Sequence, residues 1–193
     1  GFTLDVWLVY GVQPMTDHPN ILFICVDQLT PFVLTTYGSS VGQTPNINRL
    51  AEHGVVFDAA YCNSPICAPS RASMYSGRLP STIGAYDNGA EFASSWPCFP
   101  HHLRHEGYRT VLSGKMHFVG ADQLHGLEER LTTDIYPAQM DWIPEWTKGP
   151  IENYGTSVRS HLPRPVVSTS NYTGQYRYDT HVQHRALDWL YHK

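Results

Sequence analysis

The sequence has few charges and no excess of positive ones. Its 193 residues include 13 lysines and arginines against 17 aspartates and glutamates, which gives a net charge of −4, and only 16% are charged. Such a chain, with 41% hydrophobic residues, is typical of a folded domain rather than a disordered segment. Without a basic excess, nothing favours binding to a phosphate backbone, so we expect no nucleic-acid partner.

The chain also lacks paired cysteines and a long apolar run. None of its four cysteines forms a CxxC pair, which argues against a disulfide framework. The opening residues 1–13 are moderately apolar, but they carry no basic region and are too short to cross a bilayer. We therefore expect residues 1–18 to be a leader outside the folded core. We also expect no membrane contact and a cytoplasmic location.

What the chain does contain is an alternation of strand and helix patterns. Residues 20–27 form an apolar run that ends in a carboxylate, which is typical of a strand buried on both faces of a parallel sheet. The other predicted strands cover 55–61 and 108–113, and the predicted helices cover 45–53, 69–77, 101–106 and 179–192. The last helix has Val182, Ala186, Leu187 and Leu190 on one face. The alternation predicts an α/β fold with a parallel sheet.

One short segment combines a cysteine, a proline and an arginine at the start of a predicted helix. It reads Cys67-Ala-Pro-Ser-Arg71, and the helix that follows ends at Gly77. A helix N-terminus favours bound anions because its N–H groups and its dipole point toward them. Taken alone, the segment is also consistent with a buried cysteine beside a helix that carries a surface arginine.

Two further groups of polar residues follow predicted strands. Lys115 and His117 come after the strand over 108–113, in a block that runs from Gly107 to Gly120. Lysine is a compact positive charge that suits anionic oxygens, and histidine can transfer protons near neutral pH. Asp27-Gln28 ends the first strand and offers oxygens of the kind that hard divalent cations prefer. We expect these side chains and Cys67 to meet at the carboxyl edge of one sheet.

These segments together resemble the type I sulfatase family, whose signature is Cys-x-Pro-Ser-Arg, a helix ending in Gly, and a later Gly-Lys-x-His block. The resemblance covers about residues 19–142 and implies an alkaline-phosphatase-like α/β fold, with a parallel-rich central sheet flanked by helices. It implies that a formylglycine-generating maturation enzyme oxidises Cys67 to a formylglycine nucleophile. It also implies that Arg71 and Lys115 stabilise sulfate oxygens and that His117 removes a proton from a formylglycine hydroxyl.

The same resemblance implies a divalent cation in the site. Its ligands would be Asp27, Gln28 and the oxidised Cys67. Ca²⁺ is the first expectation, with Mg²⁺ or Mn²⁺ as alternatives, because all three take oxygen ligands.

Residues 86–93 and 114–137 resemble choline sulfatases in particular, although Ser70 stands where many of them carry Gly. The resemblance implies hydrolysis of choline sulfate, with Asn88 contacting a sulfate oxygen. Trp142 is the candidate for binding the quaternary ammonium, since such ions lie over aromatic faces, and core packing is the alternative for this side chain. A phosphonate or phosphate monoester hydrolase of the same superfamily is the competing prediction.

The family takes a further carboxylate and a His or Asn ligand from later in the chain, and no segment here supplies that pair. We therefore expect residues 19–193 to be the N-terminal portion of a sulfatase catalytic domain, incomplete at its C-terminus and of little activity alone. A catalytically silent truncated protein is the alternative from another class. Homo-oligomerisation of the full-length protein is left open.

Overall fold

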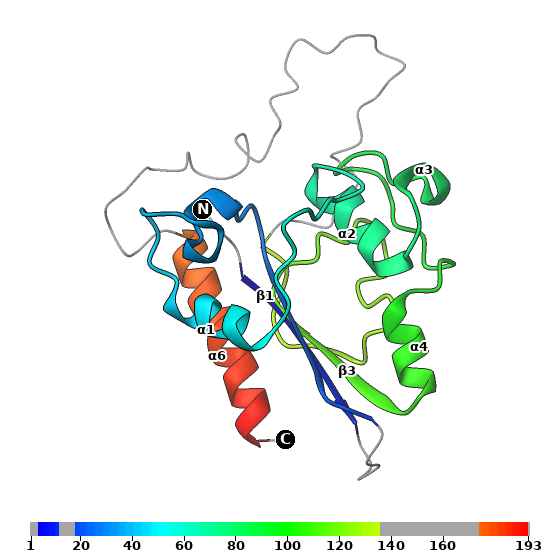
Figure 1. The fold of residues 1–193 in the computed structure, drawn as a ribbon. Coiled ribbons are helices and arrows are strands. Elements are labelled where there is room, and N and C mark those ends of the chain that lie inside the picture. Colours follow the sequence, from blue (N-terminus) through cyan, green and yellow to red (C-terminus); the bar gives the residue numbers. More distant parts are fainter. Residues whose placement is uncertain (1–3, 12–17, 136–173, 193) are drawn as a thin grey trace.

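The computed structural model describes residues 4–11, 18–135 and 174–192, which form a small sheet with helices around it (Figure 1). The strands are β1 (Leu4–Gly11), β2 (Ile21–Val26), β3 (Tyr108–Ser113) and β4 (Glu129–Arg130). The helices are η1 (Pro31–Val33), η2 (Thr35–Tyr37), α1 (Pro45–His53), α2 (Cys67–Ser76), α3 (Pro80–Ile83), α4 (Phe99–His105) and α6 (Gly174–His192). The predicted α/β class is confirmed.

The four strands lie in the order β2-β1-β3-β4. β1 pairs antiparallel with both β2 and β3, whereas β3 and β4 pair in parallel. β2, β3 and β4 therefore run in one direction, as predicted for a parallel-rich sheet, and β1 is the antiparallel exception. The carboxyl ends of β2 and β3 consequently lie at the same edge of the sheet, which is where the candidate site forms.

Part of the expected leader, residues 1–18, forms a strand of the sheet. Leu4–Gly11 lies within residues 1–18, yet its backbone pairs with β2 over Leu4–Val9 and with β3 over Val6–Gly11. The segment contains valine, tryptophan and tyrosine, which favour strands, so it has the propensity to pair once two strand edges are available. The expectation that residues 1–18 lie apart from the sheet does not hold for this strand.

The apolar strand β2 is not buried on both faces, contrary to our prediction. Leu22 is 55% exposed and Ile24 is 49% exposed. The reason is that, in the described part of the chain, β2 contacts no element besides β1, so no helix covers its faces. An apolar run makes a strand suitable for burial on both faces. It becomes buried only if helices or other elements cover those faces.

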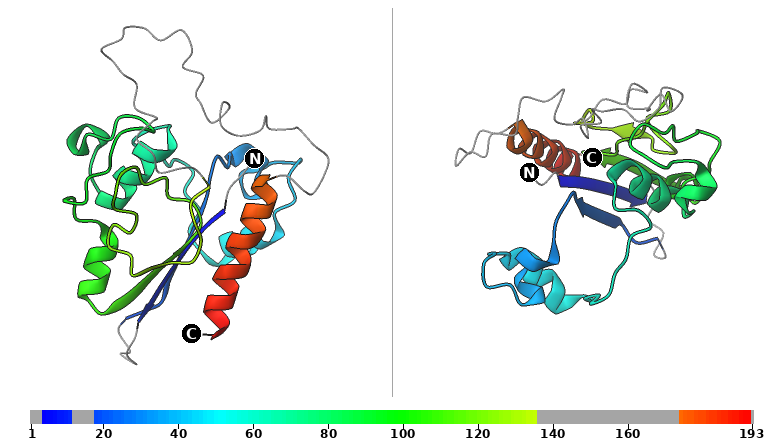
Figure 2. Two further views of the ribbon diagram at one scale, coloured as in Figure 1. Left: turned by 180° about the vertical axis from the view of Figure 1, so that it is seen from behind. Right: turned by 90° about the horizontal axis from the view of Figure 1, so that it is seen from above.

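The segment over 55–61 is not a strand, which corrects a second prediction. Residues 55–61 lie in bends and irregular structure, and Tyr61 is 93% exposed. They belong to a lobe formed by residues 30–62, which includes α1. The view from above shows this lobe and α6 on opposite sides of the strands (Figure 2).

Helix α6 covers the sheet by packing on β1 and β3. Its buried side chains are Val182, Ala186 and Trp189, which pack around Val111 of β3. The prediction is wrong for two of the four residues that we placed on this face, because Leu187 is 40% exposed and Leu190 is 50% exposed. Trp189 takes their place, since it lies seven residues after Val182 and so points to the same side of the helix.

The largest core cluster lies among α2, α4, β3 and the loops that follow β3. Its aromatic centre includes Tyr75, whose ring contacts Phe99 and Phe118 with centroid separations of 4.8 and 5.0 Å. The buried members are Ala72, Tyr75, Ile83, Ala85, Phe92, Cys98, Leu112, Met116, Phe118 and Leu127. This core fixes α2 against the segment after β3, and both carry residues of the candidate site.

His125 is enclosed in this core and should make the fold sensitive to acid. Its ring stacks on Phe92 at 4.2 Å and meets Phe118 edge-on at 4.5 Å. Burial lowers the pKa of His125, and the nearby Asp122 carboxylate offsets part of that effect. The unfolded chain thus binds a proton on this side chain more readily than the folded one, so stability should fall as the pH drops below the ordinary histidine pKa.

We expect His125→Phe to flatten this dependence, because a phenyl ring can occupy the same stack and does not titrate. Urea unfolding midpoints at pH 7.5 and pH 5.5 would measure it. Exposed His105→Gln is the matched control and should leave the pH dependence as it is in the parent chain. An identical loss of stability in the parent and in His125→Phe would show that other groups cause the acid sensitivity.

Candidate active site

Two segments that follow the parallel strands β2 and β3, which lie on either side of β1, meet at the carboxyl edge of the sheet. Asp27 comes directly after β2, and Lys115 follows β3 by two residues. The Nζ atom of Lys115 lies 2.9 Å from Oδ2 of Asp27, and the lysine side chain is 1% exposed. An ammonium so deeply buried needs a charged partner, and Asp27 supplies it.

Helix α2 brings a second cation to the same carboxylate. Arg71 is 5% exposed, and its Nη2 atom lies 3.3 Å from Oδ1 of Asp27. Its Nη1 atom donates to the carbonyl oxygen of Lys115 at 3.0 Å. Arg71 therefore links α2 to the ends of both strands, and the surface position considered for it above is excluded.

Cys67 lies in the first turn of α2, two residues earlier than the predicted start of this helix. Its Sγ atom lies 3.1 Å from Nδ1 of His117, and its thiol donates to Oδ1 of Asn88 at 3.3 Å. The same Asn88 oxygen accepts a hydrogen bond from the backbone N–H of Ala68 at 3.0 Å. Asn88 thus binds the first turn of the helix and orients the side chain of Cys67.

The charges in the site shift the pKa values of two groups. Burial alone would raise the pKa of Asp27, but Lys115 and Arg71 outweigh it and lower the pKa. Burial, followed by the charge of Lys115, lowers the pKa of His117 to about 4. At neutral pH Asp27 is therefore ionised and His117 is neutral, so that a ring nitrogen of His117 can accept a proton.

Two site residues have left-handed backbone conformations. The φ angle is 58° at Gln28 and 55° at His117. Residues other than glycine seldom adopt such angles, and the strain of about 1–3 kcal/mol persists only where surrounding contacts fix the backbone. These angles direct the chain sharply away from the strand ends, and functional sites are where such strain concentrates.

A cleft of about 540 Å³ opens onto this arrangement. Asp27, Gln28, Cys67, Arg71 and Lys115 line it, together with residues of the 62–66 segment. The volume is large enough for a small organic ester. Of the predicted site residues, Asp27, Gln28, Cys67, Arg71, Asn88, Lys115 and His117 are brought together, whereas Trp142 lies outside the described residues.

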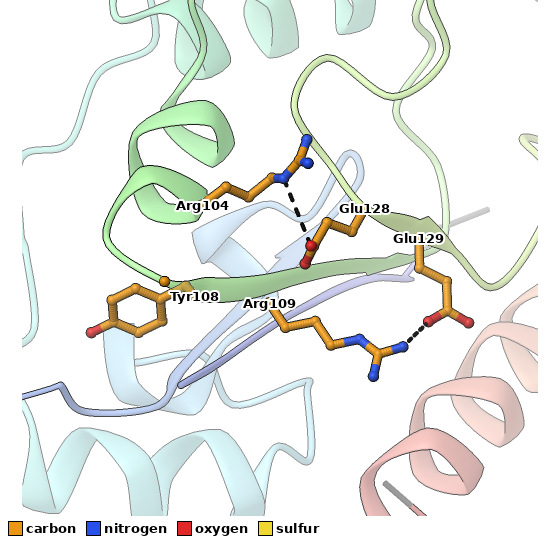
Figure 3. Close-up of a pocket in the computed structure, with 6 residues that line it drawn as sticks. Arg104, Tyr108, Arg109, Glu128 and Glu129 are labelled. Carbon is orange, nitrogen blue, oxygen red and sulfur yellow. Dashed lines mark hydrogen bonds and ion pairs between the residues drawn. The ribbon is translucent and has the colours of Figure 1, made fainter. Parts of the chain in front are cut away.

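A second cavity, of about 480 Å³, lies near the opposite end of β3 (Figure 3). Its arginines are already paired with carboxylates, Arg109 with Glu129 at 2.9 Å and Arg104 with Glu128 at 3.8 Å. It contains no nucleophile. Of these two cavities, the one at the Cys67 end of the sheet is therefore the candidate for catalysis.

Comparison with known proteins agrees with this geometry. The family model described as "Sulfatase" matches residues 19–193. The chain belongs to the sulfatase family. A choline-sulfatase of Rhizobium meliloti is 46% identical over 176 residues, which cover 91% of this sulfatase chain and 34% of that relative.

More distant sulfatases match shorter stretches. An N-acetylglucosamine-6-O-sulfatase of Bacteroides thetaiotaomicron is 35% identical over 56% of this chain and 19% of its own length. The human iduronate 2-sulfatase is 36% identical over 57% of this chain and 20% of its own length. The chain thus spans about a third of the first relative and about a fifth of the other two. Among the described residues, no helix of this sulfatase is long and apolar enough to cross a membrane.

Sulfatases generally use formylglycine and a divalent cation. Cys67 fits the first, because it lines the cleft at a helix start and contacts His117. The described residues supply only some of the ligands that a divalent cation needs. Both carboxylate oxygens of Asp27 already pair with Arg71 and Lys115, and Gln28 adds one amide oxygen. The described residues contain no group of three or more His, Cys, Asp and Glu placed to bind a metal. Ca²⁺ takes about six to eight oxygens, so these residues hold at most part of a cation site.

Proposed function

We propose that the protein hydrolyses a small alkyl sulfate ester, with choline sulfate as the first candidate, and that residues 19–193 belong to its catalytic domain. The observation that carries the proposal is the convergence of Cys67, Arg71 and Lys115 on one cleft, with His117 in contact with Cys67 behind it. The similarity to a relative named choline-sulfatase supports the choice of ester. Trp142 remains our prediction for the contact with choline.

The proposal requires oxidation of Cys67 by a formylglycine-generating enzyme. Two electrons and two protons leave the Cβ–Sγ group, the sulfur departs as sulfide, and a water oxygen takes its place as the aldehyde. The maturation enzyme must therefore supply an electron acceptor such as dioxygen. Once hydrated, the aldehyde offers one hydroxyl to attack sulfur and a second whose deprotonation expels sulfate.

Each neighbouring side chain has a role that follows from its position. Arg71 and Lys115 place positive charge on the cleft wall, where it would stabilise the sulfate oxygens as the ester bond breaks. Neutral His117, whose Nδ1 atom lies 3.1 Å from the Cys67 sulfur, would accept the proton of the second hydroxyl. Asn88 would orient the residue at position 67 and contact a sulfate oxygen.

Asp27 and Gln28 are our proposed ligands for a divalent cation, with Ca²⁺ before Mg²⁺ or Mn²⁺. Both offer oxygen, the ligand type that these cations prefer. Further ligands would have to come from outside the described residues. The chemistry that a bound cation adds is the polarisation of an oxygen on the attacking or leaving group.

The comparisons favour sulfate over phosphate monoesters. The family model and a relative named choline-sulfatase both support the sulfatase interpretation. The charge of the site does not decide between the two esters, because Arg71 and Lys115 share one carboxylate and the proposed divalent cation would add two positive charges to them.

The test is hydrolysis of choline sulfate by the matured full-length protein, measured as sulfate release, beside choline phosphate at equal concentration. We expect kcat/KM for the sulfate ester to exceed that for the phosphate ester by about 100-fold, which corresponds to about 2.7 kcal/mol of transition-state stabilisation. An aryl sulfate without a quaternary ammonium tests the choline preference. Faster release of phosphate than of sulfate would reject the proposal in favour of a phosphomonoesterase.

A further inference from the structure

The segment that carries Lys115 and His117 is buried without being a helix or a strand. Lys115, Met116, His117, Phe118 and Val119 are each at most 2% exposed. A buried backbone has to satisfy its N–H and C=O groups, and an irregular segment has no ladder of its own to do so. Side chains from residues 123–134 make several of these bonds, and we call Gln123, Arg130, Thr132 and Asp134 the loop-supporting cluster.

The strongest of these contacts comes from Asp134. Its Oδ2 atom accepts hydrogen bonds from the backbone N–H groups of Met116 at 2.8 Å and of His117 at 2.7 Å. Two successive N–H groups that point to one anion, with the second residue in the left-handed conformation, form an anion-binding nest. The left-handed φ of 55° at His117 is therefore matched to this carboxylate.

The rest of the cluster fixes both Asp134 and the remaining backbone groups. Arg130 lies 3.2 Å from Oδ2 of Asp134, and the two side chains are 11% and 7% exposed. Thr132 accepts the N–H of Gly114 at 2.8 Å. Gln123 donates to the carbonyl oxygens of Phe118 at 2.9 Å and of Gly120 at 2.8 Å.

We infer that Asp134 is a positioning residue, which sets the backbone of Met116 and His117 so that the His117 ring faces position 67. For its catalytic consequence, this inference rests on the proposed function. Asp134 does not line the cleft, so it acts through His117 rather than on the ester. Lys115 is fixed independently, because its Nζ atom pairs with Asp27.

This difference predicts which kinetic constant responds. Loss of the Asp134 contacts should misplace His117 while Lys115 still binds the ester. In the matured protein, Asp134→Ala should lower kcat by about 100-fold, the cost of misplacing a catalytic group by about 1 Å, and change KM little. Asp134→Asn should restore most of kcat, because the contacts with Met116, His117 and Arg130 end on one oxygen that an amide also provides.

Two measurements on the unoxidised chain test the geometry without any turnover. Amide hydrogen exchange at Met116 and His117 should become at least about 10-fold faster in Asp134→Ala than in the parent or in Asp134→Asn. The NMR cross-peak between Cys67 Cβ protons and the His117 ring should also disappear. Asp122→Ala is the matched control, because Asp122 accepts the N–H groups of Leu124 and His125 in the same way but does not contact the Lys115–His117 segment.

The outcomes separate the inference from the function it rests on. Faster exchange confined to Met116 and His117, together with a fall in kcat that Asp134→Asn repairs, supports the positioning role. Unchanged exchange at these two amides overturns it, whatever the activity. Equal losses of kcat in Asp134→Ala and Asp122→Ala also overturn it, since they point to general destabilisation. If the matured full-length protein releases no sulfate, the proposed function fails and the exchange result alone decides the role of Asp134.

Discussion

Cys67→Ala removes sulfate-ester hydrolysis, with an expected loss in kcat of at least about 10⁴-fold. The size follows from the role of the nucleophile, since replacing the nucleophile of a hydrolase commonly costs more than any neighbouring contact. Cys62→Ala is the matched control, because Cys62 lines the same cleft and is exposed. It should retain the parent rate within a few-fold. Sulfate release after co-expression with a formylglycine-generating enzyme measures both variants.

Mass spectrometry separates a chemical role of Cys67 from a structural one. The tryptic peptide from Leu50 to Arg71 contains both Cys62 and Cys67, so fragmentation must locate the change. We expect loss of sulfur and gain of an aldehyde at Cys67, with Cys62 left as a thiol. Undiminished turnover by Cys67→Ala, or by a parent protein that keeps the Cys67 thiol, would contradict the nucleophile assignment.

The sequence predicted the site better than the sheet around it. Asp27 and Lys115 were expected to meet because each follows a strand, and parallel strands end at the same edge. That reasoning needs the direction of β2 and β3 but not their adjacency. It therefore survives the insertion of β1 between them, which no pattern in residues 1–18 had led us to expect.

Burial was harder to predict than strand formation. The apolar run over 20–27 does form β2, yet its side chains are largely exposed, and the apolar residues over 55–61 form no strand. Apolar patterns are local, whereas burial depends on which distant segments cover a face. For the same reason Trp189, rather than Leu187 or Leu190, was identifiable only once α6 lay against Val111.

Asp134 is a residue of the site region that the sequence motifs did not identify. It lies inside a stretch noted for its resemblance to choline sulfatases, but nothing in the residue itself marks a contact with Met116 and His117. The available signal was indirect. A glycine-rich irregular segment that carries two functional side chains and is buried must be hydrogen-bonded by other parts of the chain.

Asp27→Ala is expected to destabilise the folded chain by about 3–5 kcal/mol, the cost found when one partner of a buried ion pair is removed. Lys115 is 1% exposed and Arg71 is 5% exposed, and Asp27 is the carboxylate they share. Without it, two buried cations would repel each other at the edge of the sheet. Equilibrium unfolding in urea at pH 7 gives the loss directly.

A second ion pair in the same sheet provides the control. Arg109 and Glu129 are also 2.9 Å apart, but their side chains are 36% and 35% exposed. Glu129→Ala should therefore cost no more than about 1 kcal/mol, as for other solvent-exposed pairs. Similar losses in Asp27→Ala and Glu129→Ala would show that the charges around Asp27 are better solvated than their burial indicates.

The double variant Asp27→Ala/Lys115→Met identifies which cation causes the loss. Methionine keeps much of the lysine stem but not its charge, so one of the two repelling cations disappears. The double variant should recover part of the stability lost in Asp27→Ala. Arg71 should keep its hydrogen bond to the backbone carbonyl oxygen of residue 115, which the substitution does not remove.

Low pH should have the same effect on the parent protein as Asp27→Ala. The pKa of Asp27 is lowered in the folded state, so the stability that its ion pairs contribute is present above the ordinary aspartate pKa and is lost as the pH falls through the folded value.

A double variant no more stable than Asp27→Ala would show that the loss of stability comes from Arg71. The Arg71–Asp27 ion pair would then be the main electrostatic contact between α2 and the edge of the sheet.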